Sequence, residues 1–419
     1  MDQLTEKNLK LVSDSQDGEP SSSICKSKAI SYIEDWISDK SIQYLLSGEI
    51  KLEGNNSSLD YISSLIFLEA KKDDSGGVTK ELLRNYFSVW SFDCRKTLIK
   101  SLIASLQFSK VNNSIEIFIN AVTGSLDNVD LAVIKHWIAN CKRKLQGLKV
   151  KDHIMPIFYG KTGGGKSVAI QKLVSPIQDL TMEAPLSFVN DSRNDFNFTE
   201  KLVIIFDELS RANKTDMSSL KQRITSPYIE SRKLGSSKNY KGLNITNFLG
   251  ASNSEVKDII QDPTSARRFY QVNCLNLMDW EAINSIDYTS LWQSIDSNPK
   301  FDYLKDIRST LKSRQETIRA LDTVEEWIED LQLSTDEGYP NSYYSVDDLF
   351  KSHLKWMKSQ YKERSAVSKN LFGRRMTSIY GKSKPISGIR CYSIPSRIEY
   401  SLNAGISPIS ESANPDIML

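Results

Sequence analysis

The sequence predicts an α/β fold with a parallel sheet, placed between a helical region and a small carboxyl-terminal domain. Between residues 150 and 275, four short β-rich runs are separated by helical or loop segments. These runs are IMPIFYG (154–160), KLVIIFDE (201–208), LNITNFLGASN (243–253) and RRFYQVNCL (267–275). Strands that alternate with helices are typical of a parallel sheet. A glycine-rich turn directly after the first run is the second observation that favours this fold.

The region ahead of the sheet is predicted to be all-helical. Residues 1–25 are polar and rich in Ser and Asp, so we expect a disordered tail there. From 26 to 148 the apolar residues recur at helical spacing, with breaks at SGEIKLEGNNSS (47–58) and KKDDSGG (71–77). The recurring apolar residues include Ile33, Trp36, Ile37, Leu131, Ile134, Ile138 and Cys141.

Two further domain boundaries follow the sheet. Helical periodicity returns from 279 to 335, so the sheet-containing domain is expected over 149–335. The segment DEGYPNSYY (336–344) is typical of a linker, and a last domain is expected over 343–398. The polar residues 399–419 are expected to form a flexible tail.

Composition limits the classes of protein that fit. The 419 residues carry a net charge of only +2, so any contact with nucleic acid must come from local basic patches. The five cysteines and three histidines are scattered, which argues against a disulfide framework or a structural zinc. No apolar run approaches the roughly 18 residues that a membrane helix needs. We expect a reduced, intracellular, soluble protein with no membrane partner.

The glycine-rich turn GKTGGGKS (160–167) fits the pattern G-x-x-x-x-G-K-[ST] and lies between a strand and a helix. Glycines let the backbone curl so that its N–H groups face phosphates. Lys166 is expected to reach the β- and γ-phosphates, and Ser167 to bind Mg²⁺. A glycine-rich turn that fits by chance is the alternative. The predicted nucleotide-binding residues are Gly160, Lys161, Thr162, Gly163, Gly164, Gly165, Lys166 and Ser167.

The run KLVIIFDELS (201–210) is predicted to be a buried strand that ends in two acids. Asp207 is expected to hold the Mg²⁺ shell, and Glu208 to act as the general base on the attacking water. A strand that ends in solvated carboxylates is the alternative. Its position downstream of Lys166 favours a Walker B motif.

Three more polar residues stand at the ends of the last two β-rich runs. Asn253 ends the third run, and Arg267 and Arg268 begin the fourth. Asn253 ends a strand and is expected to contact the γ-phosphate or the water, although Asn is also common in ordinary turns. Arg267 and Arg268 open the next strand. Adjacent arginines are usually solvated, but one of them could compensate transition-state charge on the phosphates of a neighbouring subunit.

The order and spacing of these four elements resemble superfamily 3 helicases, the compact AAA+ ATPases of viruses and mobile elements. The stretches LKQRITSPYIESRKLGSSKNYKGLNITNFLGASN (220–253) and DPTSARRFYQV (262–272) look like the virulence-associated E and phage or satellite primase-helicase group. The resemblance covers about 130 to 275 and is fainter over 340 to 395. It implies an α/β AAA+ P-loop ATPase core in a hexameric ring that translocates on DNA, with Asn253 as sensor and Arg267 or Arg268 as arginine finger.

The same resemblance implies two DNA-binding elements. Between Walker B and the sensor, ESRKLGSSKNYKGLN (230–244) matches the β-hairpin that in this family projects into the pore of the ring. The alternative is an ordinary surface hairpin exposed to solvent. Its basic residues and tyrosine suit phosphates and a base or sugar. Residues 345–394 resemble the winged-helix domain of this group, with a basic second half. The predicted DNA contacts are Arg232, Lys233, Lys238, Tyr240, Lys241, Arg374 and Arg375.

We find no acidic hhhDhD-type metal signature in 26–148, so primer synthesis is not expected, and by analogy this region would be an oligomerising collar. The sequence thus predicts an ATP- and Mg²⁺-dependent replicative DNA helicase of a phage, satellite or mobile genetic element. Its expected partners are single-stranded and duplex DNA, further copies of the chain and host replication proteins, in the cytoplasm of a bacterial host cell. The alternatives are an origin-melting initiator without processive unwinding, or a signalling or defence NTPase that is no motor.

Overall fold

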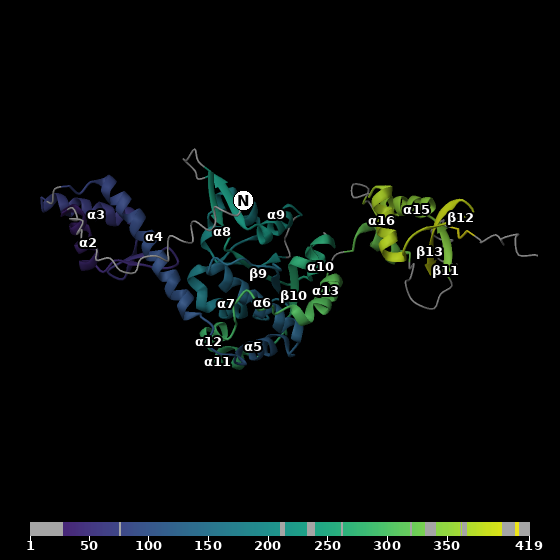
Figure 1. Ribbon diagram of the computed structural model, residues 1–419, viewed down its shortest axis with the longest axis horizontal. Helices are drawn as coiled ribbons and strands as arrows, with labels where there is room; N and C mark the ends of the chain where they lie inside the picture. Colours follow the sequence, from purple (N-terminus) through teal and green to yellow (C-terminus); the bar gives the residue numbers. More distant parts are fainter. Residues whose placement is uncertain are drawn as a thin grey trace, which may run out of the picture. The chain divides into compact units, whose positions relative to one another are not determined.

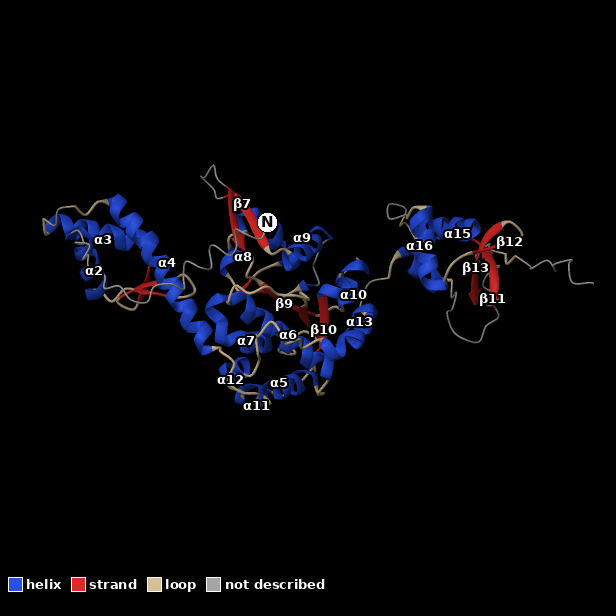
Figure 2. Cartoon of the chain, viewed as in Figure 1, coloured by secondary structure: helices blue, strands red, loops and turns tan. Residues whose placement is uncertain are grey.

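The computed structural model describes residues 28–74, 77–209, 214–232, 239–260, 263–318, 321–331, 341–360, 362, 367–395 and 407–409. The chain divides into two compact units, Met1–Ala104 and Ser105–Leu419. Figure 1 labels many of the helices and strands of both units, and Figure 2 colours them by type. Among the described residues, no helix has both the length and the apolar character that a membrane span requires.

The amino-terminal unit packs three helices around one apolar core. Its helices are α2 (Lys28–Asp39), α3 (Leu59–Lys72) and α4 (Lys80–Ser105), and its strands are β1 (Gln43–Tyr44), β2 (Ile50–Leu52) and β3 (Asn55–Ser57). Ile33, Ile62 and Leu83, one from each helix, are fully buried and belong to this core. The apolar residues that recur at helical spacing therefore lie on the inward faces of these helices, as expected for amphipathic helices.

The prediction that this region is all-helical is wrong, because residues 43–57 form a three-stranded antiparallel sheet of order β1-β2-β3. Leu52 pairs with Asn55, so only two residues connect β2 to β3. These two, Glu53 and Gly54, have φ of 51° and 83°. Positive φ at both central positions is typical of a type I′ hairpin turn. The segment that we interpreted as a break between helices is this hairpin.

The second unit contains a five-stranded parallel sheet of order β10-β4-β9-β6-β5. The strands are β4 (Met155–Tyr159), β5 (Thr181–Glu183), β6 (Val203–Phe206), β9 (Asn247–Ser252) and β10 (Phe269–Asn273). Every residue of β6 and β9 is buried, as expected for strands covered on both faces. The predicted parallel sheet is confirmed, and the short edge strand β5 is the one that sequence reasoning missed.

Helices surround this sheet in both Figure 1 and Figure 2. They are α5 (Ser114–Thr123), α6 (Asn128–Leu145), α7 (Lys166–Val174), α8 (Asn197–Glu200), α9 (Lys214–Thr225), α10 (Val256–Ile259), α11 (Trp280–Ser285), α12 (Tyr288–Gln293) and α13 (Arg308–Thr317). Short 3₁₀ turns connect several of them, including Pro263–Arg268 directly before β10.

The domain boundary differs from the one we expected at residue 148. The helix α6 packs on the sheet, where the indole nitrogen of Trp137 donates a 3.0 Å hydrogen bond to the carbonyl of Phe248 in β9. The end of α5 is joined to the chain after β10, because Leu275 N donates to Val122 O at 2.8 Å. Since the helical spacing is the same in both regions, the sequence could not show that α5 and α6 belong to the α/β unit.

Between α9 and β9 the chain forms an antiparallel pair, β7 (Tyr228–Arg232) and β8 (Asn239–Leu243), in a two-stranded sheet of its own. Tyr228 pairs with Leu243 and Arg232 with Asn239. The strand pair of the β-hairpin that the family resemblance implied at 230–244 is therefore present, and residues 233–238 lie outside the described part of the chain.

The carboxyl-terminal part has its own apolar core. Its elements are α14 (Thr323–Asp330), β11 (Asn341–Ser345), α15 (Val346–Ser359), α16 (Lys369–Tyr380), β12 (Lys384–Ile386) and β13 (Ile389–Pro395), and its antiparallel sheet has the order β11-β13-β12. Trp327 of α14, Leu349 of α15 and Phe372 of α16 are fully buried in this core.

Two expected boundaries of this part need correction. The helix α14 lies in the predicted 149–335 domain, yet its apolar face packs against α15 and α16, so the carboxyl-terminal core begins near residue 323 rather than at 343. In the predicted flexible tail 399–419, the described residues 407–409 return to the sheet, where Ile409 N donates to Tyr343 O at 2.7 Å.

Candidate functional site

The carboxyl edge of the parallel sheet gathers residues from three separate strands. The loop 160–165 follows β4, Asp207 follows β6 and Asn253 follows β9. Because β9 lies between β4 and β6, the carboxyl ends of these strands meet at one place. Crevices outside the carboxyl ends of parallel strands are the usual ligand sites of open α/β sheets.

Lys166 lies at the centre of this edge. Its Nζ donates to Gly160 O at 2.9 Å, to Lys161 O at 2.8 Å and to Asn253 Oδ1 at 2.8 Å. The side chain is only 7% exposed, and these three acceptors are all neutral. An anionic ligand beside this buried ammonium would form the charge-assisted contact that its three neutral acceptors do not provide.

The loop around Lys166 has the backbone that its glycines permit. Gly163 and Gly165 have φ of 79° and 88°, a region that residues with a side chain rarely adopt. Gly165 is also the residue that caps the amino terminus of α7. The first N–H groups of a helix lack intrahelical partners, so this turn presents backbone donors at a helix amino terminus.

Two oxygen ligands suited to a hard cation lie beside the loop. The hydroxyl of Ser167 donates a hydrogen bond to Asp207 Oδ1. Mg²⁺ usually binds through one or two protein oxygens and completes its shell with water and phosphate, so a hydroxyl and a carboxylate in contact fit this ion. Among the residues that the structure describes, there is no group of three or more His, Cys, Asp and Glu side chains able to hold a metal.

Glu208 follows Asp207 directly and is exposed at the same edge. The structure therefore brings together Lys166, Ser167, Asp207 and Asn253 by hydrogen bonds and places Glu208 next to them. Their chemical roles remain predictions.

Arg267 and Arg268 lie at the opposite edge of the sheet. They directly precede β10, whose first residue Phe269 is in register with Met155, the first residue of β4. The five residues of β4 span about 15 Å, so the arginines lie at least that far from the loop that follows β4. The structure does not bring them to the Lys166 loop of the same chain.

The two arginines line a cavity of about 330 Å³ at this amino edge, together with His153, Arg308, Gln315 and five other residues. Arg267 is exposed and Arg268 is half-buried. Burial lowers the pKa of His153 to about 4, with the Lys144 ammonium as a second cause, so His153 is neutral near pH 7. Arg308 is bound by Asp152 and Asp302 at 3.0 and 2.8 Å.

The predicted DNA contacts lie in two parts of the chain, the hairpin segment and the helix α16. Lys233 and Lys238 lie outside the described residues, and for Arg232 and Tyr240 only the backbone is described. Lys241 is exposed, but its Nζ is 2.8 Å from Glu230 Oε1 on the paired strand and lies 5.1 Å from the centre of the Tyr228 ring.

The other two predicted contacts lie on α16. Arg374 is exposed on this helix. Arg375 instead has its Nε 2.7 Å from Asp322 Oδ2, and the Asp322 side chain is only 14% exposed. Arg375 is thus paired with a carboxylate of the same domain, and Arg374 is the better candidate for an external contact.

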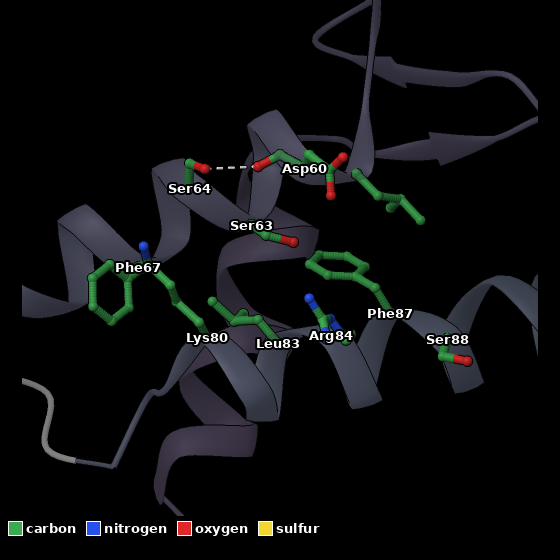
Figure 3. Close-up of a pocket in the computed structure, with 10 residues that line it drawn as sticks. Asp60, Ser63, Ser64, Phe67, Lys80, Leu83, Arg84, Phe87 and Ser88 are labelled. Atoms are coloured by element: carbon green, nitrogen blue, oxygen red, sulfur yellow. Dashed lines mark hydrogen bonds between the residues drawn. The ribbon is translucent and has the colours of Figure 1, made fainter. Parts of the chain in front are cut away.

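A further cavity of about 390 Å³ lies in the amino-terminal unit, between α3 and α4. Figure 3 shows Arg84 and Lys80 beside the apolar side chains of Leu83 and Phe87, with Ser63 and Ser64 on the opposite helix. The Lys80 ammonium lies 5.4 Å from the centre of the Phe67 ring. This cavity contains none of the residues that sequence reasoning selected.

The sheet topology and the glycine-rich loop define a protein with a parallel α/β core compatible with a P-loop. A family model described as "Virulence-associated protein E-like domain" matches residues 103–320. These residues make up more than half of the chain, which therefore belongs to this family. A search of curated proteins found no match.

Two solved structures show a weak likeness to this chain. "The A form apo structure of NrS-1 C terminal region-CTR" is 16% identical, with a TM-score of 0.42, and the match covers 69% of this chain and 77% of that one. A second apo structure of the same NrS-1 region has the same identity and TM-score and covers 70% and 77%. Similarity at this level carries no inference about activity.

Sequence reasoning missed one part of the site, the segment that follows β10. Cys274 N donates to Tyr159 O at 2.7 Å, and residues 274–280 continue along the glycine-rich loop. The segment CLNLMDW matches no nucleotide-binding pattern. The sequence offers one local indication in this segment, Asp279, a residue type that often caps the start of a helix. Its carboxylate caps α11 by accepting a 3.0 Å hydrogen bond from Ala282 N.

Proposed function

We propose that this protein is an ATP-dependent DNA helicase of the superfamily 3 type, from a phage, satellite or related mobile element, that acts as a ring. The observation that carries the proposal is the contact set of Lys166, which joins the glycine-rich loop to Asn253 on a neighbouring strand. A P-loop lysine, a metal-binding hydroxyl and carboxylate, and a polar residue on the adjacent strand are what phosphoryl transfer to water needs.

The proposed roles follow from the positions of the side chains. Lys166 would exchange its neutral acceptors for the β- and γ-phosphate oxygens, and Asn253 would then be released toward the γ-phosphate or the attacking water. Ser167 and Asp207 would hold Mg²⁺, which would neutralise part of the negative charge of the phosphate groups. Glu208 would accept a proton from the water as general base.

The separation of the two sheet edges supports a ring. Arg267 and Arg268 are too far from their own loop to contact its phosphates, but a cationic cavity at a subunit boundary can receive the phosphates of a neighbour. Arg267 is the better finger because it is exposed, whereas Arg268 is half-buried. A homo-oligomer, with the hexamer as the proposed size, follows from this arrangement and from the family resemblance.

Two elements would bind DNA. The hairpin β7–β8 lies between Walker B and the sensor strand and carries Lys241, which would exchange Glu230 for a DNA phosphate. The carboxyl-terminal part has the element order of a winged helix, α14-β11-α15-α16-β12-β13, with the sheet order β11-β13-β12. We assign it as a winged-helix domain in which the exposed Arg374 contacts duplex DNA.

The direct test is the rate of ATP hydrolysis by the full chain with and without single-stranded DNA, followed by strand displacement from a tailed duplex. A helicase is stimulated by DNA and displaces the strand. If DNA stimulates hydrolysis but no strand is displaced, the origin-melting initiator is favoured. If DNA does not change the rate of hydrolysis, the signalling or defence NTPase is favoured.

The hairpin has its own test. Lys238→Ala combined with Lys241→Ala should remove DNA stimulation and unwinding but leave basal hydrolysis intact, because the pair would grip DNA rather than ATP. Lys257→Ala is the matched control, since Lys257 is exposed and paired with Glu255 at 2.8 Å as Lys241 is with Glu230. An equal loss of basal hydrolysis in the double variant would make the hairpin a structural element only.

A further inference from the structure

The glycine-rich loop is covered on one side by the segment that follows β10. A Cβ atom built on Gly160 would lie 3.2 Å from Cys274 O, and one built on Gly164 would lie 3.5 Å from Leu275 O. A Cβ on Gly165 would lie 2.1 Å from Cζ2 of Trp280. Three glycines of one motif therefore face the same neighbour, which we call the covering segment (residues 274–280).

The covering segment is fixed at both ends. Near its start, Cys274 N donates to Tyr159 O at 2.7 Å and Leu275 N to Val122 O at 2.8 Å. Near its end, Asp279 N donates to Ala121 O at 3.1 Å. These bonds join the segment to β4 and to α5, so the indole of Trp280 is held in place by ordered backbone.

Trp280 makes the closest of these approaches. Its six-membered ring lies against Gly165, with Cζ2, Cη2 and Cε2 all within 3.2 Å of the position of a Cβ. Gly165 has φ of +88° and directly precedes Lys166, the residue with which α7 begins. Glycine has the widest choice of backbone conformations, so a loop with three glycines in a row needs an external contact to stay in one of them.

We propose that Trp280 is a positioning residue of the nucleotide site, whose indole holds Gly165 and the turn before Lys166 in the conformation that binds phosphate. This inference rests on the proposed nucleotide site. Without the indole, the loop would sample other conformations, and the apparent affinity falls in proportion to the fraction of competent loops. If that fraction falls to about one tenth, the Kd for nucleotide rises about tenfold.

The proposal separates binding from chemistry. The ring of Trp280 lies against the backbone of the loop at Gly165, whereas the proposed chemical roles belong to the side chains of Lys166, Ser167 and Asp207. Its loss should therefore raise the Kd for MgADP and the KM for MgATP by a similar factor, while kcat at saturating ATP changes much less.

The experiment measures MgADP binding by calorimetry for the full chain and for Trp280→Ala, Trp280→Phe and Leu277→Ala. Trp280→Ala should bind about tenfold more weakly, and Trp280→Phe should recover part of this loss because it keeps a ring near Gly165. Leu277 belongs to the same segment but is 89% exposed, so Leu277→Ala should bind like the wild type. Wild-type affinity in Trp280→Ala, or an equal loss in Leu277→Ala, overturns the proposal.

A second readout covers the case in which Trp280→Ala does not fold. The indole next to Gly165 should change its fluorescence when MgADP binds, and this change should disappear in Trp280→Phe while binding remains. If MgADP changes the fluorescence of Trp280→Phe as much as that of the wild type, the proposal is overturned. If the wild type binds MgADP without hydrolysing ATP, the proposed function fails and the role of Trp280 is still tested. If the wild type hydrolyses ATP and Trp280→Ala matches it, only the role of Trp280 fails.

Discussion

The two edges of the five-stranded sheet differ in what they contain. At the carboxyl edge, the side chains expected to bind nucleotide already contact each other within one chain, as the bonds of Lys166 and Ser167 show. At the amino edge, Arg267, Arg268 and Arg308 line a cavity together with the neutral His153 and with Asp152, which pairs with Arg308. One edge brings together the side chains proposed to bind nucleotide, whereas the other holds cationic side chains without a glycine-rich loop. This difference is what a site shared between neighbouring copies would require.

The largest expected effect is at the carboxyl edge. Lys166→Ala should remove nucleotide binding or reduce turnover by at least about 10³-fold, because a buried positive charge at the phosphates is lost. Calorimetry and a phosphate-release assay measure the two quantities. Lys172→Ala, on the same helix α7, is the control and should behave like the wild type. Turnover that survives in Lys166→Ala would rule out a P-loop mechanism.

The amino edge is tested by Arg267→Ala and Arg268→Ala. The finger variant should keep MgATP binding and lose about 10³-fold or more in turnover, the range known for arginine fingers. Mixing it with Lys166→Ala should restore partial activity, because some interfaces then pair an intact loop with an intact finger. Arg193→Ala is the control and should keep wild-type turnover, because Arg193 is exposed. Full turnover in both arginine variants, or activity per chain that persists where sedimentation shows monomers, would refute the shared site.

Glu208→Gln should sharpen the assignment of the carboxyl edge. The variant should bind MgATP normally and hydrolyse it about 10²-fold to 10⁴-fold more slowly, since the amide cannot accept the proton of the attacking water. Single-turnover kinetics with radiolabelled ATP separate this loss from a loss of binding. Asp207→Asn is the comparison, because weaker Mg²⁺ binding should appear there and not in Glu208→Gln. Near-normal turnover would remove Glu208 as the base.

The smallest effect concerns stability at the amino edge, where the Lys144 ammonium donates to Thr246 O just before β9. Burial lowers the pKa of Lys144 from its usual 10.5 to about 8. The unfolded chain keeps this proton up to about pH 10.5, whereas the folded chain releases it near pH 8. The free energy of unfolding therefore gains up to about 3 kcal/mol from this group as the pH rises through that window.

Lys144→Met lacks this titration. Its stability relative to the wild type should be highest at pH 8 and should decrease by pH 10, as measured by urea unfolding at both values. Lys149→Met, at an exposed position five residues further on, should show no such trend. A pH-independent difference between Lys144→Met and the wild type would show that the buried ammonium does not lose its proton in this window.

The candidate site could be predicted from the sequence where its residues are neighbours in the chain. The loop 160–167 and the pair Asp207 and Glu208 each stand in a local pattern of strand, turn and helix, which the folded chain retains. The covering segment could not be predicted, because its contact with Gly165 depends on β10 lying beside β4 and on α11 starting at Trp280. Contacts of this kind leave no periodic signal.

Local sequence alone determined four of the five strands of the sheet, the glycine-rich loop, the hairpin segment and the basic character of α16. The tertiary structure decided which basic side chains of the chain lie at the surface and which are buried. Lys142, Arg143 and Lys144 are consecutive basic residues, yet all three are buried and donate to backbone carbonyls. It also decided that Asn253 contacts Lys166, 87 positions away in sequence, while Arg267 and Arg268 lie at the far edge. The physical reason is that residue type fixes the local backbone and charge, whereas strand order and packing decide which groups meet and which face water.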